Sequence, residues 1–363
     1  MLRSHVTADA MVRNGSHEEE VRDGRSSVTS PAGLPLRHAL RPDALEAFGN
    51  RCAKNFRHWS RWARRQGLGA YRFYDRDIPE FPFAIDCYVP ADPGRGGRLH
   101  MQEVETGWVQ DAPAHAAWLD AAREAVVAAT GVGIHDIAVK QRQRRSGGGQ
   151  HARTGVAGVD FQVLEAGLRF WINLEAYLDT GLFHDHRAMR ALVRSRARGR
   201  RMLNLFGYTG SFTVYAAAGG AVLSDTVDLS NTYLDWAARN FAANGLDAAR
   251  HRLVRADVLR WLSMAVAEQR QYDLIVLDPP AFSNSKAMTG VLDIQRDHAE
   301  LIADTLRLLA PAGELYFSTN LRSFRLDGAL ARSKQCTDIT GRTRAEDFRD
   351  PRVHHAFVWQ AAA

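Results

Sequence analysis

The sequence predicts an α/β fold, with a doubly wound, mostly parallel sheet preceded by a small α+β domain. From about residue 181 onward, short apolar strands alternate with helical segments of about 10 to 15 residues, which is the pattern of right-handed βαβ units. Before that point, short strand candidates occur without this alternation. A chain of 363 residues with 45% hydrophobic content can form about two domains, each with its own core.

The small domain is predicted over residues 37–175, after an N-terminal tail. Residues 1–36 are rich in Ser, Gly, Arg and Glu and lack apolar periodicity, so we expect a mobile tail. Apolar spacings of three and four predict an amphipathic helix over 43–65, with Arg and Lys on its other face. The further elements expected are strands at 70–75, 83–89 and 99–105, a helix at 113–130, a strand at 134–140 and a hairpin over 161–173.

A basic arm, residues 141–155, follows the strand at 134–140. Its candidate RNA contacts are Arg142, Arg144 and Arg145, because the guanidinium group binds phosphate through two parallel hydrogen bonds. A solvated connector explains the same composition equally well. The net charge of +6 and the excess of arginine over lysine fit a polyanionic partner, although a biased genome composition would give the same excess.

The alternating region contains the elements of the parallel sheet. Strands are predicted at 201–206, 221–228, 251–257, 272–278 and 314–320, and helices at 211–218, 230–244, 258–269 and about 291–309. Ligands of such sheets bind beyond the carboxyl ends of the strands, at the topological switch point. The residues at those strand ends are therefore the candidate site.

The first three strand ends indicate an adenosyl ligand. Gly207 and Gly210 allow a tight turn close to a ligand, at the N-terminus of a helix. Asp228 lies 18 residues after Gly210, where an acid accepts hydrogen bonds from ribose hydroxyls. Asp257 ends the third strand and either accepts from an adenine amine or caps the next helix. Because neither GxGxxG nor a Walker A loop is present, S-adenosylmethionine fits better than a dinucleotide or ATP.

The fourth strand ends in LDPPAFSNSK, which predicts a clamp for a nucleobase. Asp278 offers a carboxylate at the mouth of the site, Pro279 and Pro280 fix an extended bend, and Phe282 can stack on a flat ring. Such acceptors take the hydrogens of a base amine, whereas guanine N7 has an in-plane lone pair and needs no general base. A turn that only ends a strand is the structural alternative.

Neither a metal nor a cysteine nucleophile is predicted. His184 and His186 flank Asp185 near a helix start, and two histidines two residues apart on a helix point away from each other. The three cysteines are far apart and lack CxxC spacing, so we expect free thiols. A cysteine-dependent attack on cytosine C5 is disfavoured because no cysteine neighbours the DPP segment. With no apolar stretch of about 18 residues, we expect a cytoplasmic protein without a membrane span.

Several long motifs resemble the C-terminal half of the bifunctional 23S ribosomal RNA guanine methyltransferase family, the half that methylates guanine N7. They are LDTGLFHDHR (178–187), LNLFGYTGSFTVYAAAGGA (203–221), VDLSNTYLDWAARN (227–240), LDPPAFSNSK (277–286) and QRDHAEL (295–301). The segment 50–88 resembles the start of that half, and the likeness runs from about residue 41 to the end. His184 departs from the family pattern, in which an aliphatic residue is expected.

The resemblance implies a Rossmann-like class I fold that uses S-adenosylmethionine (SAM), with the methyltransferase domain over 176–363. It places three groups of residues on the cofactor: Phe183, Asp185 and Arg187 at the methionine end, Asn204, Phe206, Tyr208, Thr209 and Gly210 along it, and Asp228, Ser230 and Asp257 at the ribose and adenine. Asp278 to Phe282 would hold the target base.

The leading hypothesis is methylation of guanine N7 in 23S ribosomal RNA during large-subunit biogenesis. The same cofactor residues would serve a methyltransferase acting on a base amine or on cytosine C5. A noncatalytic RNA-binding assembly factor and a nicotinamide dehydrogenase are further alternatives. The THUMP domain and the N2-guanine methyltransferase half of the fused family have no counterpart here, so the small domain and the basic arm are expected to capture RNA.

Overall fold

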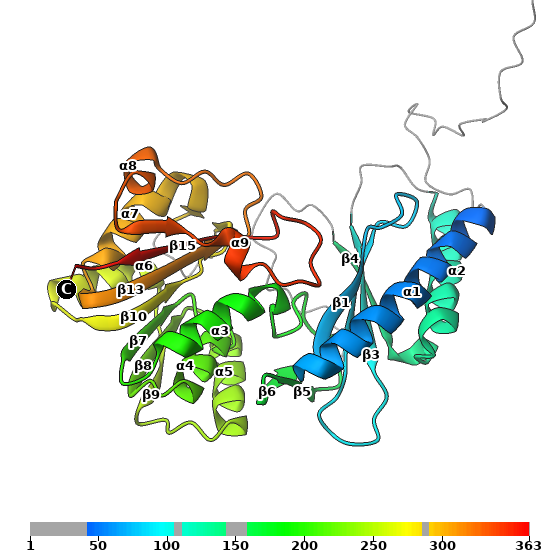
Figure 1. Ribbon diagram of the computed structural model, residues 1–363, viewed down its shortest axis with the longest axis horizontal. Coiled ribbons are helices and arrows are strands. Elements are labelled where there is room, and N and C mark those ends of the chain that lie inside the picture. Colours follow the sequence, from blue (N-terminus) through cyan, green and yellow to red (C-terminus); the bar gives the residue numbers. More distant parts are fainter. Residues whose placement is uncertain (1–41, 105–110, 143–157, 285–289, 363) are drawn as a thin grey trace, which may run out of the picture.

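The computed structural model describes residues 42–104, 111–142, 158–284 and 290–362. The first part of the chain forms a four-stranded sheet in the order β1-β2-β3-β4 (Figure 1). Its strands are β1 (Ala70–Asp75), β2 (Phe83–Tyr88), β3 (Arg98–Val104) and β4 (Ile137–Arg142), with only the β3–β4 pair parallel. This confirms the predicted α+β arrangement.

Two helices pack together beside this small sheet: α1 (Pro42–Gln66) and α2 (Ala112–Thr130). The apolar face of α1 enters the core through Phe48, whose ring stacks on Phe81 at 4.4 Å, and through Cys52. Asp111 caps α2 and Gly131 ends it with a left-handed φ of 72°. The strand predicted from residue 134 begins later, because residues 134–136 form a 3₁₀ turn.

The predicted hairpin is present as β5 (Phe161–Glu165) and β6 (Leu168–Ile172). Ala166 and Gly167 both have positive φ, 51° and 80°, as a two-residue turn of type I′ requires. The buried face of the hairpin packs against α4 (Ser211–Ala218) and α5 (Asn231–Ala243), in one apolar cluster with Tyr215 and Phe241. The domain boundary at residue 175 stays a prediction, and this packing joins the hairpin to the helices beyond it.

The larger sheet has seven strands in the order β14-β15-β13-β10-β7-β8-β9 (Figure 1). Five are parallel, namely β7 (Arg201–Leu205), β8 (Leu223–Asp228), β9 (His251–Arg255), β10 (Tyr272–Leu277) and β13 (Leu309–Thr319). The order reverses between β7 and β10, which defines the switch point. Two antiparallel strands, β14 (Cys336–Asp338) and β15 (His355–Gln360), extend the sheet and were not predicted from the sequence.

Both faces of this sheet are covered, as a doubly wound fold requires. Successive residues of β10 enter different apolar clusters: Leu274 and Val276 on one face, Ile275 and Leu277 on the other. One cluster includes α3 (Arg187–Arg196) and α4, and the other α6 (Val258–Ala267) and α7 (Ile294–Leu306).

The remaining elements are short: the 3₁₀ turn η2 (His184–His186), β11 (Phe282–Ser283), β12 (Leu292–Asp293), α8 (Gly328–Ala331) and α9 (Thr340–Thr343). In the described part of the chain, no helix combines the length and the apolar character needed to cross a bilayer.

Candidate active site

Three predicted carboxylates lie at the carboxyl edge of the seven-stranded sheet. Asp228 is the last residue of β8, Asp257 follows β9 and Asp278 follows β10. The parallel ladder pairs Leu277 with Leu205, so Asp278 begins its loop directly beside the turn that follows β7. These positions surround the switch point between β7 and β10, where α/β sheets bind ligands.

The turn after β7 has an unusual backbone. Phe206, Tyr208 and Gly210 all lie in the left-handed region, with φ of 55°, 48° and 74°. A Cβ on Gly207 would lie 2.3 Å from the side-chain methyl of Thr226, so only glycine fits there. Left-handed non-glycine residues are costly and cluster at ligand sites, which supports the predicted role of this turn.

Asp228 holds this turn in place. Its carboxylate accepts hydrogen bonds from the backbone amides of Tyr208, at 2.9 Å, and Ser230, at 2.8 Å. Burial raises the pKa of Asp228 to about 6, although these hydrogen bonds act in the opposite direction. A partly buried carboxylate with a raised pKa and a turn too tight for a Cβ are features that fit an adenosyl ligand.

Ser230 and Asp257 both cap helices. The hydroxyl of Ser230 accepts from the amide of Tyr233 at 3.3 Å, and the carboxylate of Asp257 accepts from the amide of Leu259 at 3.1 Å. The capping alternative for Asp257 is therefore realised, and its contact with adenine stays a prediction.

The other residues predicted along the cofactor make structural contacts of their own. The side-chain amide of Asn204 donates to the hydroxyl of Thr213 at 3.1 Å in the interior. The Thr209 hydroxyl donates to the carbonyl of Gly181 at 2.7 Å, and the Gly181 amide donates to the Tyr208 hydroxyl at 3.1 Å. These bonds fix the segment around residue 181 against the turn after β7.

Asp278 is held by two groups that the sequence analysis did not assign. The Ser318 hydroxyl donates to Asp278 Oδ1 at 2.6 Å, and His186 Nε2 lies 3.5 Å from the same oxygen. Phe282, in β11, is 43% exposed and Phe183 is 40% exposed, so both rings can reach a ligand. Exposed aromatic rings beside an oriented carboxylate suit the recognition of a nucleobase.

His186 bridges two acids. Its Nδ1 lies 3.2 Å from Asp185 Oδ2 while its Nε2 faces Asp278. Burial alone would lower the pKa of His186, but Asp278 and Asp185 together raise it to about 10. Burial alone would raise the pKa of Asp185, yet His186 and His354 hold it well below its usual range. The His186 ring thus lies between two carboxylates and helps to fix the position of each.

Asp185, His186 and His354 could also hold a cation. Each offers one ligand atom, and these atoms lie within 4.8 Å of one another. The spacing in the sequence pointed only to His184, Asp185 and His186, and not to His354. The two histidine side chains at 184 and 186 do face different partners, since His184 Nε2 lies 3.3 Å from Asp86 Oδ1. The absence of a metal thus stays a prediction from the sequence.

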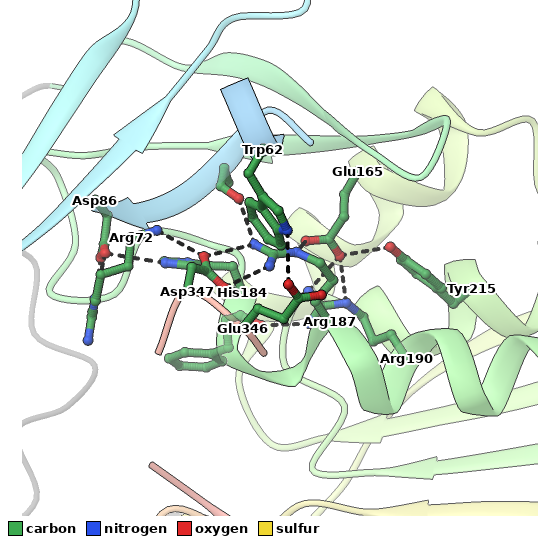
Figure 2. Close-up of polar contacts among 12 residues, drawn as sticks. Trp62, Arg72, Asp86, Glu165, His184, Arg187, Arg190, Tyr215, Glu346 and Asp347 are labelled. Atoms are coloured by element: carbon green, nitrogen blue, oxygen red, sulfur yellow. Dashed lines mark hydrogen bonds and ion pairs between the residues drawn. The ribbon is translucent and has the colours of Figure 1, made fainter. Parts of the chain in front are cut away.

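Arg187 lies at the junction between the two sheets (Figure 2). Its guanidinium donates to Asp347 at 3.0 Å, to the carbonyl of Ala70 at 2.7 Å and to Glu165 at 3.3 Å. Burial alone would lower its pKa, but Asp347 and Glu165 raise it. The predicted contact of Arg187 with the methionine end of the cofactor stays a prediction, and the structure gives this side chain three protein partners.

Glu165 is the centre of this junction (Figure 2). It is fully buried and accepts hydrogen bonds from Arg190, at 2.9 and 2.6 Å, and from the Tyr215 hydroxyl at 2.8 Å, besides Arg187. Asp347 accepts from the backbone amide of Arg72 at 3.0 Å. The small sheet, the hairpin, α3, α4 and the segment around residue 347 are thus joined by one network of buried charges.

Ser318, His354 and Asp347 were not predicted from the sequence. Ser318 carried a usable signal, because it is near the end of the predicted strand at 314–320 and follows Phe317, which pairs with Leu277 of β10. His354 and Asp347 follow the last predicted element and show no local pattern. Arg142 ends β4 but its side chain lies outside the described residues, as do Arg144 and Arg145.

Similarity to known proteins agrees with this geometry. A family model described as S-adenosylmethionine-dependent methyltransferase matches residues 114–335. SMU.776, a methyltransferase crystallised in complex with SAH, is similar with a TM-score of 0.67 and 25% identity over 87% of this chain and 82% of that chain. A Streptococcus mutans methyltransferase shares the fold with a TM-score of 0.65 and 24% identity over 87% of this chain and 81% of that one. The fold and the site therefore define a SAM-dependent methyltransferase.

Curated relatives narrow this class. Ribosomal RNA large subunit methyltransferase K of Neisseria meningitidis is 53% identical over 86% of this chain and 86% of its own length. Ribosomal RNA large subunit methyltransferase K/L of Chromohalobacter salexigens is 45% identical over 99% of this chain, which covers 47% of that protein. The chain belongs to the family of ribosomal RNA large subunit methyltransferase K, and it spans about half the length of the K/L relatives.

Proposed function

We propose that this protein transfers the methyl group of SAM to N7 of a guanine in 23S ribosomal RNA. Relatives named for methylation of large-subunit ribosomal RNA support the RNA substrate. The observation that contributes most from the structure is the carboxylate of Asp278, oriented by Ser318 and His186 at the sheet edge that also holds Asp228.

The cofactor would lie along the turn after β7. Asp228 would accept hydrogen bonds from the ribose hydroxyls and Asp257 from the adenine amine. The family resemblance implies that Phe183 and Asp185 lie at the methionine end, and Asp185 is joined through His186 to Asp278. When bound, SAM supplies an electrophilic methyl group on its sulfonium. A charged Asp185 is suited to face the positive charge of that end.

The target guanine would lie against Asp278 and Phe282. N7 has a lone pair in the ring plane and no proton, so the protein needs to orient the base rather than to remove a proton. Phe282 would stack on the purine, and Asp278 would accept from an N–H group of the base. Because the methylated purine becomes cationic, a fixed carboxylate also stabilises the charge that develops.

RNA capture is assigned to the small domain, residues 37–175, and catalysis to residues 176–363. The basic arm 141–155, with Arg142, Arg144 and Arg145, would add phosphate contacts. A ribosomal RNA substrate, naked or in an assembling particle, implies a cytoplasmic protein.

A transfer assay with labelled SAM and unmodified ribosomal RNA tests this function. We expect the wild type to transfer label to the RNA and the Asp278→Asn variant to transfer none. Nucleoside mass spectrometry should then show 7-methylguanosine, and aniline should cleave the RNA at one site. If mass spectrometry instead finds a methylated amine or 5-methylcytosine, the proposed target atom is wrong and the proposed methyl transfer from SAM to RNA still holds. Calorimetry that detects no SAH binding would favour the noncatalytic alternative.

A further inference from the structure

Helix α1 has one strongly basic face, formed by Lys54, Arg57, Arg61, Arg64 and Arg65, which we name the α1 basic stripe. All five residues are exposed, and at 100° per residue they fall within an arc of roughly 100°. From Lys54 to Arg65 the stripe extends roughly 16 Å along the helix axis. No acidic residue occurs in the sequence between residues 47 and 74, and the two acids of α1, Asp43 and Glu46, lie about two turns or more before Lys54.

The stripe also has no carboxylate partner among the residues that the structure describes. The Nε atoms of Arg57 and Arg61 donate only to helix carbonyls, those of Ala53 and Arg57, at 3.3 and 3.0 Å. Arg51, one turn earlier, does pair with Asp77 at 3.4 Å and is not counted in the stripe. Like charges three and four residues apart destabilise a helix. Arg64 and Arg65 offset part of this repulsion, because cations in the last turn interact favourably with the helix dipole. The other three cations have no such structural role.

Trp62, which is next to Arg61 in the sequence, joins helix α1 to residues near the candidate site. Trp62, on the buried side of the same turns, donates from Nε1 to Glu346 at 3.1 Å, and the Arg187 guanidinium lies 5.5 Å from its ring (Figure 2). Arg187 is two residues from Asp185, which contacts His186 beside Asp278. These contacts therefore hold the stripe at a set position relative to the candidate site, and a polyanion bound on the stripe would share that position.

The chemistry of the stripe favours RNA over a membrane. Four of its five cations are arginines, which bind phosphate oxygens through two parallel hydrogen bonds. A membrane-surface helix needs an exposed apolar face beside its cations. The apolar face of α1 is instead packed in the core of the small domain, and none of the exposed large apolar side chains in the described part of the chain lies on α1.

We propose that the α1 basic stripe binds the sugar–phosphate backbone of the RNA substrate and presents it to the edge of the large sheet. The proposal rests on the proposed function, since it takes RNA as the substrate. It assigns RNA contact to a rigid helix, independently of the basic arm.

The test compares two variants that lose the same charge. In the first, Arg57, Arg61 and Arg64 are changed to Gln. In the matched control, Arg250, Arg270 and Arg307 are changed to Gln; each pairs with a partly or fully exposed acid near the end of α5, α6 or α7. The dissociation constant of an unmodified 23S rRNA fragment is measured over a salt series, and SAH binding is measured by calorimetry.

The stripe variant is expected to lower the slope of log affinity against log salt by about 2, because each lost phosphate contact removes about 0.7 from it. The control should retain the wild-type slope, and both should bind SAH as wild type does. A further variant with Lys at the same three stripe positions keeps the charge and should restore the slope. It also shows that the helix tolerates substitution.

Equal slopes in the stripe variant and wild type would overturn the inference, as would equal losses in stripe and control variants. Binding to vesicles containing phosphatidylserine that is lost in the stripe variant while the RNA slope is unchanged would also overturn it. The proposed function fails separately, when wild-type protein binds RNA with the expected slope but transfers no methyl group.

Discussion

Replacing Glu165 by Gln removes the charge at the centre of the buried network between the two sheets. Glu165 and Arg190 are both 0% exposed, and the carboxylate accepts from Arg190, Arg187 and Tyr215. Removing one partner of a buried ion pair costs about 3–5 kcal/mol, because the other charge stays buried without compensation. Arg187 keeps Asp347, so we expect a loss of about 3 kcal/mol in the free energy of unfolding.

The matched control is Glu268→Gln, which breaks a 2.7 Å pair with Arg270 in which both side chains are exposed. Such surface pairs contribute about 0–1 kcal/mol. Urea unfolding of wild type and both variants at pH 7, followed by fluorescence, gives the two differences. If Glu165→Gln lies within about 1 kcal/mol of the control, the reasoning about burial is wrong.

The pH dependence of this difference has a defined sign. Burial alone would raise the pKa of Glu165, but Arg190 and Arg187 hold it below its usual range. A lowered folded-state pKa means that the stabilisation is complete above the pKa of the unfolded chain and disappears as the pH falls through the folded value. The difference between wild type and Glu165→Gln should therefore shrink in acid, and a difference that grew there would contradict this assignment.

Three further predictions concern the candidate site. The affinity of the wild type for SAH should weaken as the pH falls through about 6, the pKa to which burial raises Asp228. In calorimetry, the Asp228→Asn variant should lack this pH dependence and should bind SAH at least about tenfold more weakly than the wild type at pH 8. The Asp278→Asn variant should bind SAH normally and lose turnover. His186→Gln should reduce turnover more than SAH affinity. Asp278 and Asp185 raise the pKa of His186 to about 10, so the contribution of His186 to stability is complete below pH about 6.5 and is lost as the pH rises through 10. The melting temperatures of wild type and variant should therefore converge in alkali. Gly210→Ala should lower stability by about 1–3 kcal/mol in urea unfolding, because φ is 74° and a Cβ would meet the Phe241 ring at 2.6 Å, and an unchanged midpoint would refute this.

The parallel part of the fold was predictable because its signals are local. The helix predicted at 211–218 has those bounds, and Ser230 caps α5 as expected. The strand-end acids Asp228 and Asp278 could be placed together without knowing any long-range contact, since parallel strands end at one edge of a sheet.

What the sequence did not give depends on contacts between distant segments. His354 reaches Asp185 from beside β15, an antiparallel strand whose short apolar run carries no signal of its pairing. Arg187 was expected at the cofactor from resemblance alone. Its partners Glu165, Asp347 and Ala70 come from three separate regions, and no spacing along the chain brings such partners together.

The hairpin β5–β6 has a consequence for how this enzyme can be divided. Its apolar face fills the surface that α4 and α5 would otherwise expose, including Tyr215 and Phe241. A protein fragment beginning at residue 176 would leave those rings in water and invite aggregation. We therefore expect that a fragment containing the methyltransferase sheet needs to start near residue 158, before the predicted boundary at 175, so that it includes the hairpin that covers these helices.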